Sequence, residues 1–326
     1  MGASVEIAGI ACKVPDRVVT NVELESLVDT SDEWIKKRTG IRRRHISTGE
    51  RSVDMALEAA SLALANSGVD RNDIGLIISS SITSEYVTPS MSGYVQKALD
   101  IDNCANMDIS AGCSGFVYAL STAASLMESM EKDAALVISS ESISQYIDWK
   151  DRSTCVLFGD GAGAVVLKRS SEPKVHFPVL SGSPDKEDVI ICKREMRKTP
   201  FNNVDPKDEQ PDHIRMNGRE VFTYAVSAAD AVLHKLLVKC GDKPFTKVIP
   251  HQANAKIIDY VKRKLRFKSD QFFLDIDEYA NTSSATIPIA MCDAYKKGWL
   301  TKGDRVALVA FGSGLTCGGL VVDWTI

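Results

Sequence analysis

The stretch NMDISAGCSGFVYALSTAASLMES, residues 106–129, decides the fold. Residues 107–109 are predicted to form a short buried strand, residues 110–112 a tight turn of small residues, and residues 116–127 a helix. This helix is apolar on nearly every face, and helices of that kind lie in the interior of a protein. The sequence therefore places Cys113 between a strand and a central helix.

A cysteine at this position is a candidate nucleophile. The positive end of the helix dipole and the unpaired N–H groups of the first turn favour a thiolate, with a cysteine pKa lowered by roughly 1 to 5 units. Gly112 and Gly115 have no side chains, so a substrate carbonyl could approach the backbone closely. The alternative for an isolated cysteine is a small core residue, and partners elsewhere in the chain must decide between the two.

Composition sets the class of protein. The chain has 326 residues, 44% of them hydrophobic, and a formal net charge of −4, which suits one large α/β unit or two domains. This charge gives no reason to expect binding to nucleic acid or membrane. The first ten residues do not resemble a signal peptide and no run is expected to reach a membrane span, so we expect a cytoplasmic location. Eight cysteines without metal-ligand spacing predict no metal site.

The rest of the chain alternates helices with apolar strands. Helices are predicted at residues 52–67 and 89–99, and buried strands at 74–80 and 134–141, which together indicate a mainly parallel sheet covered on both faces. Residues 170–212 are polar and irregular and are interpreted as a link between two halves.

The glycines of GDGAGAVVL, residues 159–167, lead into a β-branched strand. A dinucleotide-binding fingerprint would need a helix there, so we reject that interpretation. Glycines that precede a strand more plausibly let two backbones pass closely.

The two halves of the chain follow the same pattern. Residues 108–129, a strand and a glycine-rich strand are echoed by residues 275–298, a strand and a second glycine-rich strand. Cys113 and Asn281 hold matching places before their helices, and a duplicated unit would bring the two helix starts together. His251 likewise lies between a predicted strand and a helix.

A basic stretch near the N-terminus, SDEWIKKRTGIRRRH, carries Trp34 among lysines and arginines. Arginine pairs with phosphate and an indole stacks on a base, so this stretch suits a nucleotide with phosphates. A solvated charged face is the alternative.

Seven motifs in this order carry a family resemblance, and together they span essentially the whole chain. They are SDEWIKKRTGIRRRH, DISAGCSGFVYAL, DRSTCVLFGDGAGAVVL, MNGREVF, IPHQAN, NTSSATIP and FGSGLT. The chain resembles the β-ketoacyl-(acyl-carrier-protein) synthase III family of the thiolase superfamily. The resemblance implies an α/β thiolase-like fold with two pseudo-duplicated halves in five αβαβα layers, divided at residues 1–172 and 173–326, in a homodimer.

The resemblance also implies a reaction. Cys113 would take an acyl group from an acyl-CoA, and His251 and Asn281 would hydrogen-bond the thioester carbonyl of malonyl-(acyl-carrier-protein), malonyl-ACP. Decarboxylation and attack would then give a 3-ketoacyl-ACP, the start of fatty acid synthesis, without a cofactor. The backbone N–H groups of Cys113 and Ser313 would form the oxyanion hole, and Phe311 would wall the site.

Binding residues follow from the same resemblance. Trp34 and Arg152 would sandwich the adenine of CoA, with Arg38 and Lys256 near its phosphates. Gly218, Phe222 and Asn254 would line the pantetheine channel. A basic cluster could dock the acidic carrier protein, although a solvated helix face is the alternative; its residues are Lys262, Arg263 and Lys264.

Four positions depart from the family pattern. Thr88 stands where a phenylalanine of the acyl pocket is common, Ala280 and Ser313 each replace a glycine, and Cys317 replaces a tryptophan. The smaller Thr88 leads to the hypothesis of an acyl-CoA longer than acetyl. A specialised polyketide or quinolone synthase and a non-catalytic acyl-binding scaffold remain as alternatives, and the sequence does not name the starter, the acceptor or the pathway.

Overall fold

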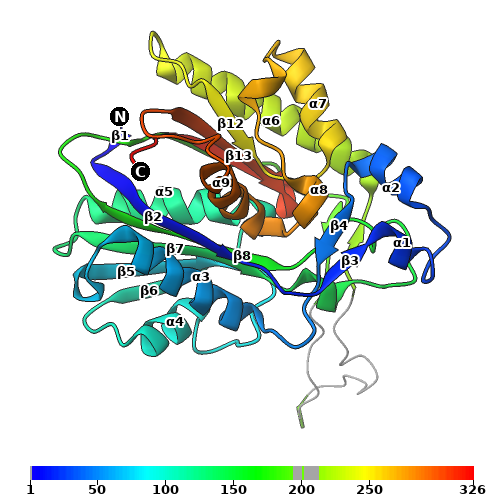
Figure 1. Cartoon of the computed structure of the whole chain (residues 1–326), viewed down its shortest axis with the longest axis horizontal. Helices are drawn as coiled ribbons and strands as arrows, with labels where there is room; N and C mark the ends of the chain where they lie inside the picture. The colour runs from blue at the N-terminus through cyan, green and yellow to red at the C-terminus, as the bar shows by residue number, and fades with distance from the viewer. Residues whose placement is uncertain (1, 194–199, 202–212) are drawn as a thin grey trace.

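The computed structural model describes residues 2–193, 200–201 and 213–326, which form two five-stranded mixed sheets (Figure 1). The first sheet has the order β2 (Val5–Lys13), β8 (Gly161–Arg169), β7 (Ala134–Glu141), β5 (Ile74–Ser80) and β6 (Ala105–Ile109). The second has the order β1 (Gly2–Ala3), β9 (Val175–Gly182), β14 (Thr316–Asp323), β13 (Arg305–Gly312) and β12 (Lys247–Pro250).

Two small sheets and the helices complete the described part. β3 (Val18–Thr20) pairs with β4 (Arg43–His45), and β10 (Ile190–Ile191) pairs with β11 (Arg215–Met216). The helices are α1 (Asn21–Leu24), α2 (Asp32–Thr39), α3 (Ser52–Ser67), α4 (Met91–Leu99), α5 (Gly115–Met127), α6 (Gly218–Cys240), α7 (Ala255–Lys264), α8 (Ile276–Tyr279) and α9 (Thr286–Lys296).

The helices and sheets stack in five layers. Helices α5 and α9 lie between the two sheets, and their apolar side chains share one buried cluster with both of them. Helices α3 and α4 pack on the outer face of the first sheet, at the bottom of Figure 1. Helices α6 and α7 pack on the outer face of the second sheet, at the top. The αβαβα order expected from the resemblance is therefore present, whereas the division at residues 172 and 173 stays a prediction.

Glycine lets α9 approach the first sheet closely. A Cβ on Gly163 would lie 2.7 Å from Cβ of Pro288, and one on Gly161 would lie 2.9 Å from Cδ1 of Ile289. Both glycines belong to β8, a strand and not a nucleotide-binding turn. The interpretation of this motif as a place of close backbone contact is confirmed.

The prediction of a mainly parallel sheet is wrong. Strand β5 runs parallel to β6 and β7, and β12 runs parallel to β13, but the remaining pairs in the two large sheets are antiparallel. The glycine turn between β13 and β14 makes an antiparallel hairpin, which apolar strand composition does not distinguish from a parallel pair.

Three local predictions also need correction. Strand β6 is exposed over four of its five residues, not buried, because it is the edge of its sheet. The polar link contains a real strand, β9, while part of it lies outside the described residues. The strand expected before Asn281 is the short helix α8.

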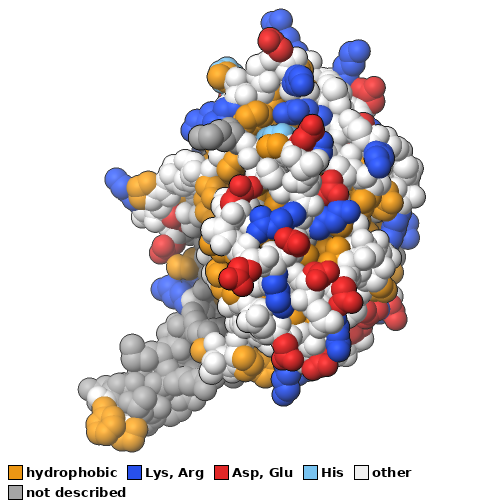
Figure 2. Space-filling view, turned by 90° about the vertical axis from the view of Figure 1, so that its left-hand side faces the viewer, with side chains coloured by type: hydrophobic (Ala, Val, Ile, Leu, Met, Phe, Trp, Pro, Cys, Tyr) orange, Lys and Arg blue, Asp and Glu red, His pale blue; other side chains and the backbone are white. Residues whose placement is uncertain are grey.

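Helix α6 is long and apolar enough to span a membrane by length and composition, against our expectation that no run would be. Its buried side chains, including Ala229, Val232 and Leu236, pack on the second sheet in a shared core. A core helix passes the same test, so this single match among the described residues is weak support for a membrane span. Figure 2 shows basic and acidic side chains interspersed over one face, in keeping with the small net charge.

The backbone at Ala280, directly after α8, has φ of +57° and ψ of −155°. Side chains disfavour this region, which explains why a glycine would be usual here. We expect Ala280→Gly to raise the free energy of unfolding in urea by about 1 kcal/mol. Ala290→Gly, inside helix α9, is the matched control and should lower it. If Ala280→Gly lowered the free energy of unfolding instead, the inference of backbone strain at Ala280 would be wrong.

Candidate active site

One cavity of ≈ 670 Å³ connects residues from both halves of the chain. At its inner end lie Cys113, His251 and Asn281; Cys113 comes more than a hundred residues before the other two in the sequence. At its outer end lie Trp34 and Arg152. The structure thus brings the three expected reactive side chains to the wall of a shared space.

Cys113 sits in a 3-10 turn, Gly112–Ser114, directly before α5. The turn fits against the second half of the chain because a Cβ on Gly312 would lie 2.5 Å from Cβ of Cys113. The sulfur accepts hydrogen bonds from the backbone N–H of Ser313 and, at 3.6 Å, from the hydroxyl of Ser283. The thiol faces the cavity but is otherwise enclosed by protein.

The expected low pKa of this thiol is wrong. Burial raises the pKa of Cys113 above its ordinary value of 9.0, and the charge of Glu141 raises it further. The hydrogen bonds from Ser283 and Ser313 lower the pKa, but by less than burial raises it. The thiol form therefore predominates at neutral pH, and the proton must leave as the sulfur reacts.

His251 follows β12 and is only 1% exposed. Burial lowers the pKa of its imidazole to about 3, so the ring is neutral at neutral pH. Its Nδ1 lies 2.6 Å from the hydroxyl oxygen of Thr286, which also lies 3.1 Å from the carbonyl of Ser283. The ring of Phe311 packs edge-on against the imidazole, with centroids 5.5 Å apart, and closes that side of the site.

Three hydrogen bonds fix the position of Asn281. Its backbone bonds to Leu157 and Gly159, and its Oδ1 accepts the N–H of Ser283 at 2.9 Å. A backbone N–H can only donate, so this contact fixes the amide with its oxygen toward Ser283. The Nδ2 group is then the part of the side chain that can donate to a bound molecule.

Sequence reasoning missed three residues around this centre: Ser283, Thr286 and Glu141. Ser283 and Thr286 contact Cys113 and His251 directly. Glu141 is fully buried at the end of β7 and accepts hydrogen bonds from Thr83 at 2.7 Å and Ser284 at 2.6 Å, which tie the two halves together beside Cys113. The hydroxyl-rich run after Asn281 was the available signal for the first two.

The outer part of the cavity carries the residues expected to hold CoA. The guanidinium of Arg152 lies 5.1 Å from the centroid of the Trp34 ring, and that of Arg38 lies 5.9 Å from it. Asn254 also caps α7 by accepting the N–H of Lys256. The expected CoA residues that line the cavity are Trp34, Arg38, Arg152, Gly218, Phe222, Asn254 and Lys256.

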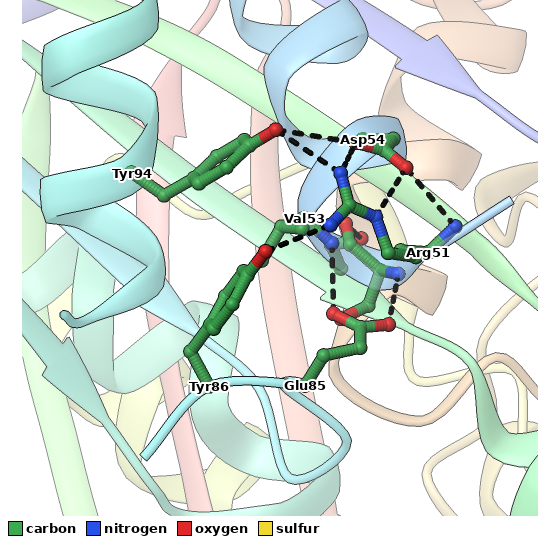
Figure 3. A network of polar contacts seen from close by, with 8 residues as sticks. Arg51, Val53, Asp54, Glu85, Tyr86 and Tyr94 are labelled. Carbon is green, nitrogen blue, oxygen red and sulfur yellow. Dashed lines mark hydrogen bonds and ion pairs between the residues drawn. The ribbon is translucent and has the colours of Figure 1, made fainter. Parts of the chain in front are cut away.

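Thr88 does not line this cavity. Its loop is fastened on the outer side of the first sheet, where Arg51 at the start of α3 bonds to the hydroxyls of Tyr86 and Tyr94 (Figure 3). Glu85 of the same loop accepts the N–H of Ser52 at 2.5 Å. Thr88 therefore does not line the cavity of its own chain, and its expected place in an acyl pocket, which the family reaches across the dimer interface, stays a prediction.

The basic cluster on α7 lies outside the cavity and is partly neutralised. Lys264 pairs with Asp230 at 2.7 Å, and Lys262 pairs with Asp259 at 2.8 Å. Arg263 donates to the backbone carbonyl of Asp259. The cluster therefore presents less net positive charge than its sequence suggests.

The site as a whole has the parts of an acyl-transfer centre. It holds an accessible sulfur, a neutral imidazole and a fixed amide beside backbone N–H groups of a turn. In the part of the chain that is described, no group of three or more His, Cys, Asp or Glu residues could hold a metal ion.

Comparison with known proteins agrees with this site. The family model of 3-oxoacyl-[acyl-carrier-protein] synthase III matches residues 107–181, and its C-terminal model matches residues 241–324. The β-ketoacyl-[acyl-carrier-protein] synthase III of Clostridium beijerinckii is 43% identical over 99% of this chain and 100% of its own length.

Solved structures are similar over the whole chain. The 3-oxoacyl-[acyl-carrier-protein] synthase III of Aquifex aeolicus is 39% identical with a TM-score of 0.89, and covers 98% of this chain and 100% of its own. A priming β-ketosynthase of the R1128 polyketide pathway is 30% identical with a TM-score of 0.91, over 99% and 97% of the two chains. The thiolase-like fold is thereby confirmed, and the chain belongs to the β-ketoacyl-(acyl-carrier-protein) synthase III family of condensing enzymes.

Proposed function

We propose that Cys113, His251 and Asn281 carry out the reaction of this family in this chain. The enzyme is an acyltransferase that condenses an acyl-CoA with malonyl-ACP, releases CO₂ and starts fatty acid synthesis. One observation carries the assignment of residues: a single cavity reaches from Trp34 and Arg152 to the three reactive side chains.

The first step forms an acyl-enzyme. The sulfur of Cys113 attacks the thioester carbon, the new C–S bond forms, and the CoA sulfur leaves with the thiol proton. The neutral imidazole of His251 lies in the same cavity and carries that proton. The N–H groups of Cys113 and Ser313 hydrogen-bond to the sulfur, and in this proposal they stabilise the oxyanion as it develops.

The second step uses the donors of Asn281 and His251. Nδ2 of Asn281 donates to the thioester carbonyl of malonyl-ACP, and the enolate that forms as CO₂ leaves attacks the acyl-enzyme. The hydroxyl of Thr286 can bond to the Ser283 carbonyl or to Nδ1 of His251. When it donates to Nδ1, the proton of the imidazole is on Nε2, which then becomes a second donor.

The CoA nucleotide belongs at the outer end of the cavity in this proposal. Arg152 now stacks on Trp34, so an adenine must part the two side chains in order to lie between them. Arg38 and Lys256 supply positive charge for the phosphates, while Gly218, Phe222 and Asn254 line the path to Cys113.

We also propose a homodimer and a carrier-protein surface on α7. Strand β6 leaves an exposed sheet edge, which a second copy could cover while bringing its Thr88 loop to the neighbouring cavity. Light scattering that gives the mass of one chain at micromolar concentration would contradict the dimer.

Arg263 and its lysine neighbours remain the proposed docking residues, and a cytoplasmic location stays a prediction.

A second candidate function is the priming of a polyketide chain. It is favoured by the TM-score of 0.91 to the priming β-ketosynthase, although the identity of 30% is lower than the 43% to a fatty-acid enzyme. Both functions use the same acyl-enzyme and differ in starter and acceptor.

The proposed function is tested with the purified enzyme, malonyl-ACP and a series of acyl-CoA starters. We expect a 3-ketoacyl-ACP and CO₂ with at least one starter and none with Cys113→Ser. The same series tests whether starters longer than acetyl are preferred. Rates that fall steadily from acetyl to octanoyl would refute that preference, and product formation by Cys113→Ser would overturn the role of Cys113.

The raised pKa of Cys113 predicts a pH profile for alkylation. The thiolate fraction rises as pH approaches the pKa, so the rate of modification by iodoacetamide should still increase at pH ~9. Peptide mapping after short exposures measures the rate at this residue alone. If the alkylation rate reached a plateau below pH ~8, the pKa of Cys113 would be low, and burial would not outweigh the hydrogen bonds to the sulfur.

Asn281→Asp keeps the oxygen that accepts from Ser283 but removes the Nδ2 donor. We expect decarboxylation of malonyl-ACP to slow about 10² to 10³-fold, while acylation of Cys113 by acyl-CoA continues. His251→Ala should slow both steps. Equal losses of acylation and decarboxylation in Asn281→Asp would count against the separate role of the amide.

Trp34→Ala tests the nucleotide end of the cavity. Loss of one stacking platform, worth about 1–3 kcal/mol, should raise KM for acyl-CoA without changing KM for malonyl-ACP. Arg43→Ala is the control, because its guanidinium pairs with Glu278 at 3.1 Å. An unchanged KM for acyl-CoA in Trp34→Ala would remove Trp34 from the CoA site.

A further inference from the structure

A pair of cysteines, Cys12 on β2 and Cys292 on α9, lies outside the cavity. Cys12 is near the end of β2, where it faces Gly163 of β8 in the register of the sheet. Gly163 touches Pro288, and Cys292 follows Pro288 by four residues, one helical turn along α9. Both cysteines are free thiols; Cys292 belongs to the central buried cluster, and Cys12 packs against that cluster.

A lysine side chain lies close to this pair. Lys296 follows Cys292 by a further helical turn, and its ammonium lies 3.8 Å from the sulfur of Cys12. Cys292 is 1% exposed, whereas Cys12 keeps part of its surface open to solvent. The pair therefore consists of one cysteine that is partly open to solvent and one that is buried.

The electrostatics of the pair favour one thiolate. The hydrogen bond from Cys12 and the charge of Lys296 lower the pKa of Cys292 to about 7, although burial and Asp293 oppose this. The pKa of Cys12 is raised, chiefly because its thiol donates that hydrogen bond. At neutral pH the pair is thus partly ionised beside a cation.

We propose that Cys12 and Cys292 form a dithiol that hydroperoxides oxidise to a disulfide, which joins β2 of one half to the central helix α9 of the other. The proposal concerns a modification site that the condensation reaction does not use. Helix α9 also carries Thr286, the partner of His251, so the disulfide would fix the helix that supports the active site.

The chemistry balances with the peroxide as the oxidant. A thiolate of the pair attacks one oxygen of the O–O bond, forms a sulfenic acid and releases the other oxygen as water or an alcohol after protonation. The second thiol attacks that sulfur, the S–S bond forms, and water leaves. To form this bond, the two sulfurs must close to roughly 2.05 Å.

The site should react before the catalytic cysteine. Burial raises the pKa of Cys113, so little of it is thiolate at neutral pH, whereas the dithiol is partly ionised beside the ammonium of Lys296. Thiolate content sets susceptibility to peroxide. The proposal therefore predicts that peroxide oxidises Cys12 and Cys292 before Cys113.

The test exposes the full-length enzyme to hydrogen peroxide, blocks remaining thiols with N-ethylmaleimide and maps peptides without reduction. We expect the Cys12 and Cys292 peptides joined and two hydrogens lighter, at a peroxide dose that leaves Cys113 able to react with N-ethylmaleimide. The joined peptide should disappear on reduction.

Lys296→Gln should slow formation of the joined peptide roughly threefold or more, because it removes the cation beside the thiolate. Lys297→Gln is the matched control, because its ammonium pairs with Asp293 at 2.6 Å and should leave the rate unchanged. The proposal would be overturned if Cys12 and Cys292 both stayed reactive with N-ethylmaleimide while Cys113 was oxidised.

Discussion

The structure depends on the close contact between the turn that holds Cys113 and the turn that holds Gly312. A side chain at position 312 would collide with Cβ of Cys113, so the two halves can meet here only through glycine. This contact brings the N–H of Ser313 to the sulfur of Cys113. Because the meeting point lies between two sheets and two central helices, the reactive thiol is enclosed by protein and reached through one cavity. The chemistry of the site therefore depends on this contact between the two halves.

Enclosure determines the protonation states of the site. It raises the pKa of Cys113 and lowers that of His251, so both groups are neutral at rest. We infer that the thiol and the imidazole exchange a proton during the reaction instead of standing as a charged pair. The prediction of a stable thiolate considered only the helix end, and helix termini shift a pKa less than enclosure by protein does. The surrounding hydroxyls of Ser283 and Thr286 then supply the local hydrogen bonds that tune each group.

Much of this arrangement could be predicted from sequence. The apolar helix after Cys113, the strands β5 and β7, and the strand that follows the glycines of residues 159–163 all have strong local patterns, and the structure confirms them. The pairing direction of strands and the exposure of β6 depend on neighbours distant in the sequence, which periodicity does not reveal. The hydrogen bonds of Glu141 could not be predicted for the same reason, because its partners Thr83 and Ser284 come from opposite halves of the chain.

The central claim is that the sulfur of Cys113 carries the acyl group. The most direct measurement is the intact mass of the enzyme after incubation with an acyl-CoA alone, followed by mapping of the modified peptide. The account predicts one acyl group per chain, on the peptide that contains Cys113 and lost on treatment with hydroxylamine. An unmodified Cys113 with every acyl-CoA tried, or an acyl group on another cysteine, would contradict it.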